Sequence, residues 1–325
     1  MPGDPILAAY SGASILVFGA SGFVGGALTR ALSASGARLT LALRDPAGLP
    51  AGSHAVEDLE IVECDVLDRS AVLAAVRMAR PDITFNLAGY GVNRDERDET
   101  LARRVNADFP VMLCHSIAQF RSRWPGAALV HAGSQLEYGM LRELREDVSA
   151  RPDTVYGRSK LGGTEGIARC ARAEHLCTVT ARLFTLYGPG EQPTRLLSSL
   201  IDAAARGVDL PLTAGTQRVE FVYIDDVVEG LLRLGLAGEE PGLVVNLASG
   251  RLTSIREFAL TAAKLLGLPA ERLRFGAIPQ RTDTMQYDSV SAERLRGLLG
   301  WVPGLSVEEG IRRTLEKHGL THVAD

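Results

Sequence analysis

The chain has 325 residues, of which 46% are hydrophobic and 23% charged, and its formal net charge at pH 7 is −4. This composition is typical of globular proteins, and the length suits two packed lobes. The charge gives no basic field for nucleic acid, and no apolar run could span a bilayer. Without a signal-peptide pattern at the start, we expect a cytoplasmic protein. The four cysteines and six histidines lack zinc-ligand spacing, so no metal site is expected.

Apolar runs and helical patterns alternate in the first part of the chain. The runs predict strands at Ser14–Phe18, Arg38–Leu43, Leu59–Cys64, Asp82–Gly89, Ala128–Ser134 and Cys177–Leu183. Helical spacing predicts helices from Phe23 to a stop at Gly36, after the capping residue Asp68, and over about Asp95–Phe120 and Thr154–Glu174. This alternation predicts an α/β fold, with a doubly wound parallel (Rossmann) sheet covered by helices on both faces.

The alternation ends after Tyr187, and shorter, mixed elements come next. They predict a second, smaller lobe. The patterns at 221–235 and Leu243–Ala248 nevertheless suit the first lobe, so the second lobe is predicted to be discontinuous. The predicted division is 1–187 with about 219–250 for the Rossmann domain, and about 188–218 with 251–325 for the smaller lobe. Asp225 and Asp226 are expected to cap the helix that begins beside them.

A glycine-rich turn joins the first predicted strand to the first helix. Gly19, Gly22 and Gly25 have the spacing G-x-x-G-x-x-G. The first glycine would permit the sharp turn, the second would let the backbone approach a pyrophosphate, and the third would let helix and strand pack closely. The helix N-terminus adds N–H groups and a partial positive charge. The alternative is a glycine-rich turn without a ligand, but the strand–turn–helix context favours a dinucleotide site.

The end of the second predicted strand bears on which dinucleotide binds. Where NAD is bound, an acidic residue usually closes this strand and holds the ribose hydroxyls. Here Leu43 or Arg44 occupies that place, and Asp45 comes late. An arginine suits a 2′-phosphate, so NADP(H) is favoured over NAD(H), unless Arg44 is only a solvated surface charge. Asp65, after the third strand, could accept a hydrogen bond from adenine or simply cap a turn.

A tyrosine and a lysine lie four residues apart in the segment VYGRSK. On a helix, Tyr156 and Lys160 share one face. A nearby ammonium is expected to lower the pKa of the tyrosine toward the working range of an acid–base group. Such pairs are common by chance, so the prediction depends on a third residue. Ser134 comes after the fifth strand at the carboxyl edge, where it could hydrogen-bond a substrate carbonyl beside Tyr156.

Seven motifs, in this order, make the sequence resemble the extended short-chain dehydrogenase/reductases of the NAD-dependent epimerase/dehydratase family: GASGFVG, NLAG, GSQLEYG, YGRSK, RLFTLYGPG, RVEFVYIDDV and LGWVPGLSVEEGI. Together they span about Ser14 to Arg313. The resemblance implies that Ser134 orients a carbonyl, that Tyr156 exchanges a proton with a sugar oxygen, and that Lys160 also holds the nicotinamide ribose. The implied cofactor-binding residues are Gly19, Ser21, Gly22, Phe23, Val24, Gly25, Arg44, Asp65, Val66, Leu87, Ala88, Gly89, Asn106, Tyr156, Lys160 and Leu183.

The residues directly after Ser134 limit which reactions of the family are expected. The family's 4,6-dehydratases carry an Asp–Glu pair there, whereas this chain has Gln135 and Leu136, which cannot do acid–base work. Glu137 is displaced by one position toward Tyr138 and is not expected to substitute, so dehydration is not expected. The sequence looks most like the branch that reduces 4-keto-6-deoxy nucleotide sugars, such as paratose and abequose synthases. That resemblance implies NAD(P)H-dependent reduction at C4, with the proton from the catalytic tyrosine.

Two other functions stay open. A nucleotide-sugar 4-epimerase would use the same three catalytic residues with a tightly retained NAD. A non-catalytic dinucleotide-binding sensor would not need them. No sequence feature identifies the nucleotide base, the sugar or the stereochemistry at C4. The resemblance also implies a homodimer formed by the helices around 95–120 and 154–174.

Substrate-side residues are implied by the same resemblance. Arg218 and Arg281 occupy places where the family has arginines on the nucleotide diphosphate, which their charge suits. Thr185 stands where many relatives have an asparagine that contacts substrate. Tyr187 and Phe221 could stack on a nucleobase, but core packing is the expected use. The predicted substrate-binding residues are Tyr90, Val92, Gln135, Thr185, Arg195, Arg218 and Arg281.

Overall fold

A central sheet of seven parallel strands organises the molecule, in the order β11-β7-β5-β4-β1-β2-β3. The computed structural model describes residues 4–46, 59–91, 96–120, 122–238, 240–279 and 285–320. From β1 the chain adds β2 and β3 on one side, and then β4, β5, β7 and β11 on the other side. This change of side between β1 and β4 defines a doubly wound Rossmann sheet and confirms the predicted fold class. The strands are β1 (Ser14–Phe18), β2 (Arg38–Leu43), β3 (Leu59–Glu63), β4 (Ile83–Asn86), β5 (Leu129–Ser134), β7 (Thr178–Leu183) and β11 (Leu243–Leu247).

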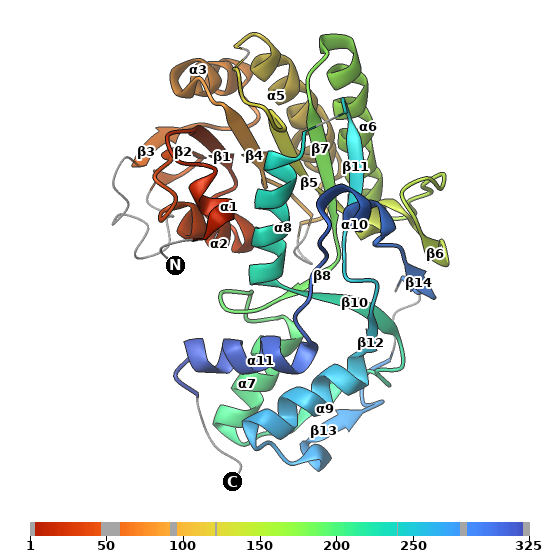
Figure 1. Cartoon of the computed structure of the whole chain (residues 1–325). Helices are drawn as coiled ribbons and strands as arrows, with labels where there is room; N and C mark the ends of the chain where they lie inside the picture. Colours follow the sequence, from red (N-terminus) through yellow and green to blue (C-terminus); the bar gives the residue numbers. More distant parts are fainter. Residues whose placement is uncertain are drawn as a thin grey trace.

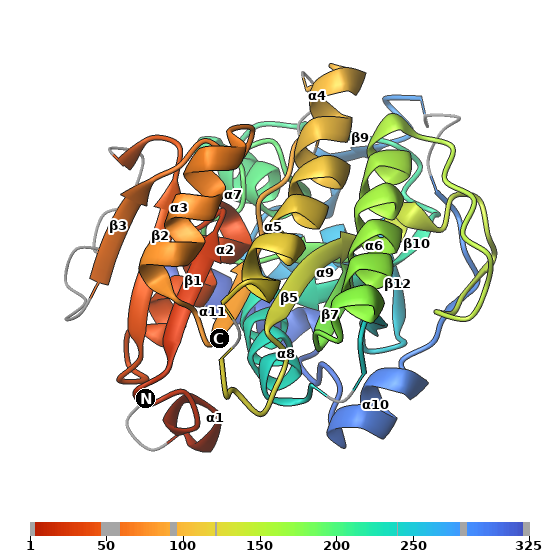
Figure 2. The same cartoon turned by 90° about the horizontal axis from the view of Figure 1, so that it is seen from above.

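Helices cover both faces of this sheet (Figure 2). Alternate residues of β1 face two separate cores: Ile15 and Val17 belong to the cluster that includes α2 and α8, whereas Leu16 and Phe18 pack with α3, α5 and α6. The helices of these layers are α1 (Pro5–Ala8), α2 (Phe23–Leu32), α3 (Arg69–Ala79), α4 (Glu99–Arg103), the π-helical turn η3 (Arg104–Asp108), α5 (Phe109–Ala118), α6 (Val155–Glu174) and α8 (Ile224–Leu236).

Helix α6 packs unusually close to its neighbours through two glycines. A Cβ at Gly163 would lie 2.1 Å from the backbone oxygen of Asn106 in η3, and one at Gly166 would lie 2.3 Å from Val111 Cγ2 in α5. Real Cβ atoms do not approach other atoms so closely, so any larger residue would push the helices apart. The glycines therefore fix the distance between α6 and the helical segment beside it.

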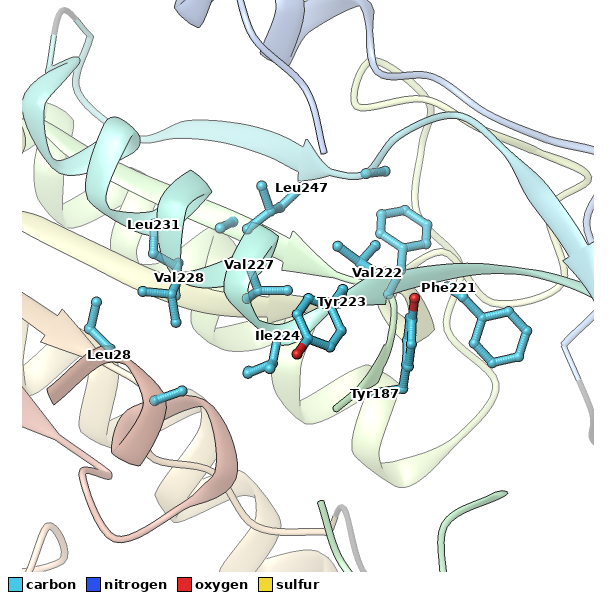
Figure 3. Packing of buried hydrophobic residues seen from close by; sticks show 14 of the residues in the cluster. Leu28, Tyr187, Phe221, Val222, Tyr223, Ile224, Val227, Val228, Leu231 and Leu247 are labelled. Carbon is cyan, nitrogen blue, oxygen red and sulfur yellow. The ribbon is translucent and has the colours of Figure 1, made fainter. Parts of the chain in front are cut away.

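Helix α8 connects the central sheet to the rest of the molecule. Figure 3 shows Val228 and Leu231 of α8 facing Leu28 of α2. Toward the other end of the same core, the rings of Tyr187 and Phe221 are buried. The Phe258 ring lies 5.2 Å from that of Tyr187 and 4.2 Å from that of Phe221, between centroids. The two aromatic residues are thus core residues, as expected.

A second group of elements lies at one end of the molecule, where α7, α9 and α11 gather (Figure 1). A three-stranded sheet in the order β12-β10-β8 leads into it, so the strand before α8 pairs outside the central sheet. The division into two lobes stays a prediction. These elements, with the short ones near β5, are η4 (Gln135–Glu137), β6 (Glu143–Leu144), β8 (Thr185–Tyr187), α7 (Leu196–Arg206), β9 (Leu210–Leu212), β10 (Arg218–Tyr223), β12 (Leu252–Ser254), α9 (Ile255–Leu266), η5 (Ala270–Arg272), β13 (Leu273–Phe275), β14 (Ser289–Val290), α10 (Glu293–Leu299) and α11 (Val307–Lys317).

Side-chain hydrogen bonds explain where α3 begins and where α2 ends. Asp68 caps α3 as predicted, because its side chain accepts hydrogen bonds from the first amides. Helix α2 ends at Leu32, before Gly36, because the hydroxyl groups of Ser33 and Ser35 bond to carbonyl oxygens of its last turn. Within the described residues, no helix combines the length and the apolar character needed to cross a membrane.

The expected capping of α8 is wrong. The strand β10 runs directly into the helix, which leaves Tyr223 as the N-cap residue without a side-chain cap. Asp226 instead accepts a hydrogen bond from the backbone N–H of Leu305 at 3.0 Å. Asp225 pairs with Lys317 of α11 at 3.6 Å. Both carboxylates therefore attach the C-terminal part of the chain to α8.

Candidate active site

The three predicted catalytic residues meet at the carboxyl edge of the central sheet. Ser134 is the last residue of β5, and Tyr156 is the second residue of α6, whose start is capped by Thr154. Lys160 lies one turn further along α6, is 3% exposed, and donates a hydrogen bond from Nζ to the backbone oxygen of Ala132 at 2.8 Å. The Ser134 hydroxyl is close enough to the Tyr156 phenol to lower its pKa. The arrangement can place a hydroxyl donor and a phenol on one substrate oxygen.

The electrostatics of these residues differ from the sequence-based expectation. Burial raises the pKa of Tyr156 above its ordinary value of 10.0, and the negative charge of Glu137 raises it further, while the Ser134 hydroxyl lowers it. Burial lowers the pKa of Lys160 from 10.5 to about 8. The expected lowering of the tyrosine pKa is wrong in this structure, because burial disfavours the phenolate and the charge of Glu137 adds to that effect. The ammonium of Lys160 is directed to a backbone carbonyl instead.

The glycine turn after β1 is shaped by two close backbone contacts. Gly19 has φ +80°, and a Cβ there would lie 2.6 Å from the backbone nitrogen of Ala88. A Cβ at Gly25 would lie 2.1 Å from the carbonyl oxygen of Gly19. At Gly22 the only neighbour within 4 Å would be that same oxygen, at 3.3 Å. Close backbone packing therefore explains the first and third glycines, whereas a Cβ at the second would make one tight contact among the described residues.

The turn fits an anionic group. Gly22 is the N-cap of α2, and no side chain caps the first amides of that helix. Ser21 and Gly22 are exposed, while Phe23 and Val24 are half-buried. Uncapped first-turn N–H groups carry a partial positive charge and seek acceptors, and a pyrophosphate supplies them. The residues present therefore suit a dinucleotide, and their binding role stays a prediction.

The loop after β4 is held by Asn106 of η3. Its side chain accepts a hydrogen bond from the backbone N–H of Tyr90 at 3.0 Å, and donates to the backbone oxygen of Tyr90 at 2.7 Å and to Ser159 Oγ at 2.9 Å. A Cβ at Gly89 would lie 3.7 Å from Lys160 Nζ. The predicted cofactor turn at 87–89 thus lies against the catalytic helix, and Asn106 bridges the two.

Four other predicted cofactor residues lie at or beyond the ends of strands. Arg44 comes directly after β2 and is exposed. Asp65 is also exposed, and its side chain accepts a hydrogen bond from the backbone N–H of Leu67 at 2.9 Å. This contact matches the alternative prediction that Asp65 caps a turn. Val66 is half-buried against the α3 and α5 core. Leu183 ends β7 and pairs in register with Ser134. Only Leu183 is thereby placed next to the catalytic residues.

A chain of hydrogen bonds extends the site from Gln135 toward β8 and β10. Gln135 Nε2 lies 3.5 Å from Thr185 Oγ1, so these two predicted substrate residues are neighbours. Tyr287 donates a hydrogen bond from its hydroxyl to Gln135 Oε1 at 3.0 Å and accepts one from the backbone N–H of Glu220 at 2.9 Å. Sequence reasoning missed Tyr287, which lies 152 positions from Gln135 and outside every motif.

Arg218 lies on a recess next to this chain. The arginine is exposed, and its Nη2 donates to the backbone oxygen of Leu252 at 2.9 Å. The recess has a volume of about 200 Å³ and is lined by Arg142, Thr216, Gln217, Arg218, Gln286, Tyr287 and Asp288. Tyr287 is thus shared by the recess and by the hydrogen bonds that reach Gln135.

The remaining predicted substrate residues have varied surroundings. Arg195 is exposed just before α7, and its positive charge lowers the pKa of Tyr156, which places it on the catalytic side. Tyr90 is half-buried and fixed through its backbone. Val92 and Arg281 lie outside the described residues.

A buried ion pair beneath the catalytic serine was not predicted as part of the site. Glu137 Oε2 accepts a hydrogen bond from Arg182 Nε at 2.8 Å, and the side chains are 0% and 5% exposed. The one available signal was the arginine in the otherwise uncharged strand TVTARL, since a buried charge in a strand needs a partner.

Comparisons with known proteins identify the family of the chain. The model of the NAD dependent epimerase/dehydratase family matches residues 15–248. The chain is 29% identical to a dTDP-6-deoxy-L-talose 4-dehydrogenase (NAD(P)(+)) of Kitasatospora kifunensis, over 96% of this chain and 98% of that protein. It is 24% identical to the CDP-abequose synthase of Salmonella muenchen, over 93% and 96%. Curated proteins named as 4-epimerases match as well.

Solved structures give the same result. The structure of MoeE5 in complex with UDP-glucuronic acid and NAD has a TM-score of 0.81 and 26% identity, and the match covers 94% of this chain and 99% of that one. The resemblance seen in the motifs, including that to nucleotide-sugar ketoreductases, is confirmed. The chain therefore belongs to the NAD dependent epimerase/dehydratase family and is an NAD(P)-dependent oxidoreductase or epimerase of the extended short-chain dehydrogenase/reductase type.

Proposed function

We propose that this enzyme reduces the 4-keto group of a 4-keto-6-deoxy nucleotide sugar. The observation that carries the proposal is the convergence of Ser134, Tyr156 and Lys160 beside the uncapped glycine turn, with Tyr156 in its protonated form. A nicotinamide bound there would supply the hydride for the keto carbon. The names of relatives, a sugar-nucleotide 4-dehydrogenase and CDP-abequose synthase, support this substrate class.

Each catalytic side chain has one task in this reaction. The phenol of Tyr156 gives its proton to the C4 oxygen, and its raised pKa suits a donor. The hydroxyl of Ser134 hydrogen-bonds the same oxygen and orients the carbonyl. The Nζ of Lys160, close to Gly89, holds the ribose of the cofactor. Because Gln135 and Leu136 have no carboxylate, these two positions cannot supply the acid–base groups that would eliminate water.

The cofactor we propose is NADPH rather than NADH. Arg44 stands one residue beyond β2 with its side chain exposed, which is where a cation could pair with a 2′-phosphate. On the substrate side, Gln135, Thr185 and Tyr287 supply hydrogen-bonding groups for the sugar, and Arg218 supplies charge for the diphosphate.

The test begins with cofactor-stripped protein, titrated with NADPH and NADH and then given a panel of 4-keto-6-deoxy nucleotide sugars. One ketosugar should be reduced with stoichiometric oxidation of NADPH. Tyr156→Phe is expected to lower kcat by about 10² to 10⁴-fold while NADPH still binds. Retained NAD with interconversion of two nucleotide sugars would replace the reductase with a 4-epimerase. Cofactor binding without any turnover would favour a sensor.

We also propose that the enzyme is a homodimer. A groove of about 470 Å³ is lined by residues of α3, η3, α5 and α6, among them Phe109, Val111 and Met112. Of these elements, η3, α5 and α6 belong to the helices around 95–120 and 154–174 that the family resemblance implies at the subunit interface, and a second copy would cover the groove. Sedimentation velocity should give twice the 34.7 kDa mass of the chain; a monomer at micromolar concentration would contradict the proposal.

A further inference from the structure

The buried pair of Glu137 and Arg182 has no direct part in the proposed reaction. Both side chains are almost fully removed from water. Burying two charges costs free energy that their attraction offsets only in part, and apolar residues of similar volume often give equal or greater stability. A Glu three residues after Ser134 is explained locally by the capping box that the two residues form at η4. Full burial of the carboxylate against Arg182 goes beyond what a capping box needs.

The second carboxylate oxygen of Glu137 binds the catalytic residue. Its Oε1 accepts a hydrogen bond from the backbone N–H of Ser134 at 2.8 Å. Gly133 makes room for this contact, since a Cβ there would lie 2.7 Å from Glu137 Oε1. The carboxylate thus fixes the backbone of Ser134, whose hydroxyl acts on the Tyr156 phenol and lowers its pKa.

Arg182 is itself held from the far side. Its guanidinium lies 4.3 Å from the centroid of the Tyr138 ring. The hydroxyl of Tyr138 donates to Asn246 Oδ1 at 2.7 Å, and the amide of Asn246 donates to the backbone oxygen of Leu144 at 3.1 Å. Three strands, β6, β7 and β11, therefore support the ion pair.

The charge of Glu137 acts on both titrating members of the catalytic set. A carboxylate disfavours the phenolate of Tyr156 and favours the ammonium of Lys160, so it promotes the protonated form of each. Around Tyr156, Glu96 acts in the same direction and Arg195 in the opposite one. On the β5 side of Lys160, the buried His131 has a pKa well below its usual range. Glu137 is the one carboxylate acting on both groups among these described neighbours.

We propose that Glu137, anchored by Arg182, is a positioning residue that fixes Ser134 and keeps Tyr156 in its proton-donating form. This inference rests on the proposed function, because a reductase needs a protonated tyrosine when the substrate binds. It also assigns a role to the position that sequence reasoning set aside when dehydration was excluded.

Glu137→Gln tests the charge, because it retains an acceptor for Ser134. The first readout is the NMR titration of ¹³C-labelled lysine in cofactor-free protein, which has only three lysines. The pKa of Lys160 should fall by about one, which is a tenfold increase in its acid dissociation constant. The second readout is the dependence of kcat/KM on pH. The pKa that governs its decline at high pH should fall by a similar amount. Glu146→Gln, which removes the carboxylate bonded to the Asn246 N–H, is the matched control and should change neither.

If both readouts of folded Glu137→Gln match the wild type, the proposal is overturned. If the wild type reduces no ketosugar but the lysine titration still shifts, the proposed function fails while the electrostatic role of Glu137 stands. Should Glu137→Gln not fold, the double variant Glu137→Leu, Arg182→Met replaces the pair by apolar groups and should fold. The double variant should lower the pKa of Lys160 as Glu137→Gln does. An unchanged Lys160 pKa in the double variant would also overturn the proposal.

Discussion

The turn after β1 and the end of β5 lie at the same edge of one sheet but are built in opposite ways. The turn depends on missing side chains, since Gly19 and Gly25 let backbone atoms touch. The end of β5 depends on buried side chains with charge, namely Glu137, Lys160 and Arg182. The first region should therefore be sensitive to added volume, whereas the second should be sensitive to altered charge. Three substitutions test this contrast.

The largest effect is expected from Gly25→Ala. The added methyl would lie 2.1 Å from the carbonyl oxygen of Gly19, so the backbone of the turn must move. The free energy of unfolding should fall by about 3 kcal/mol or more, which chemical denaturation measures. Gly297→Ala is the matched control, because no atom lies within 4 Å of its Cβ in helix α10. The control should gain up to about 1 kcal/mol; equal stabilities of the two variants would contradict the volume argument.

An intermediate effect is expected from Lys160→Met, which changes charge at nearly constant volume. Burial lowers the pKa of Lys160 from 10.5 to about 8, so the unfolded chain binds this proton more tightly. At pH 7 the variant should be more stable than the wild type by about 2 kcal/mol, after allowance for the lost bond to Ala132. The advantage should shrink as the pH rises from 8 to 10.5, because the wild-type lysine then becomes neutral in both states.

Denaturation at pH 7 and pH 9.5 measures that trend. Lys264→Met, at an exposed position of α9, is the control and should show no dependence of this kind. A Lys160→Met variant that is less stable at both pH values by the same amount would show that burial does not penalise the ammonium.

The smallest effect is expected from Gly22→Ala. A Cβ there would meet only one atom, at 3.3 Å, so unfolding should change by less than about 1 kcal/mol. The methyl would nevertheless stand where we propose that the pyrophosphate lies. NADPH affinity, measured by fluorescence titration, should fall about tenfold, or about 1.4 kcal/mol. Unchanged affinity in the folded variant would remove Gly22 from the cofactor site.

Prediction from the sequence was most accurate for elements that are determined by residues close together in the chain. The limits of β1 and β2 match their apolar runs, and α6 starts directly after its cap at Thr154. The pairing of β10 was not predictable, because an apolar run does not specify which sheet it joins. The capping role of Asp226 failed for a similar reason, since its partner Leu305 lies 79 positions away.

The same limit applies to the site. The convergence of Ser134, Tyr156 and Lys160 was predictable, because a motif places each of them on a strand end or a helix face. Their catalytic role stays a prediction. The direction of the Tyr156 pKa shift depends on burial and on Glu137, which only the folded chain brings together with it. Tyr287 was missed because hydrogen bonding to Gln135 depends on the path of the C-terminal segment.

The close packing of α6 has a consequence for the length of the chain. Each residue inserted into a helix rotates the rest of that helix by about 100°. An insertion between Lys160 and Gly163 would therefore point the glycines away from η3 and α5 or, if they stayed in place, turn Tyr156 out of the site. Beyond Gly166 an extra residue would rotate only the final two turns. The number of residues between Tyr156 and Gly166 is therefore constrained as strictly as the identity of the two glycines, and this part of α6 cannot gain or lose a residue.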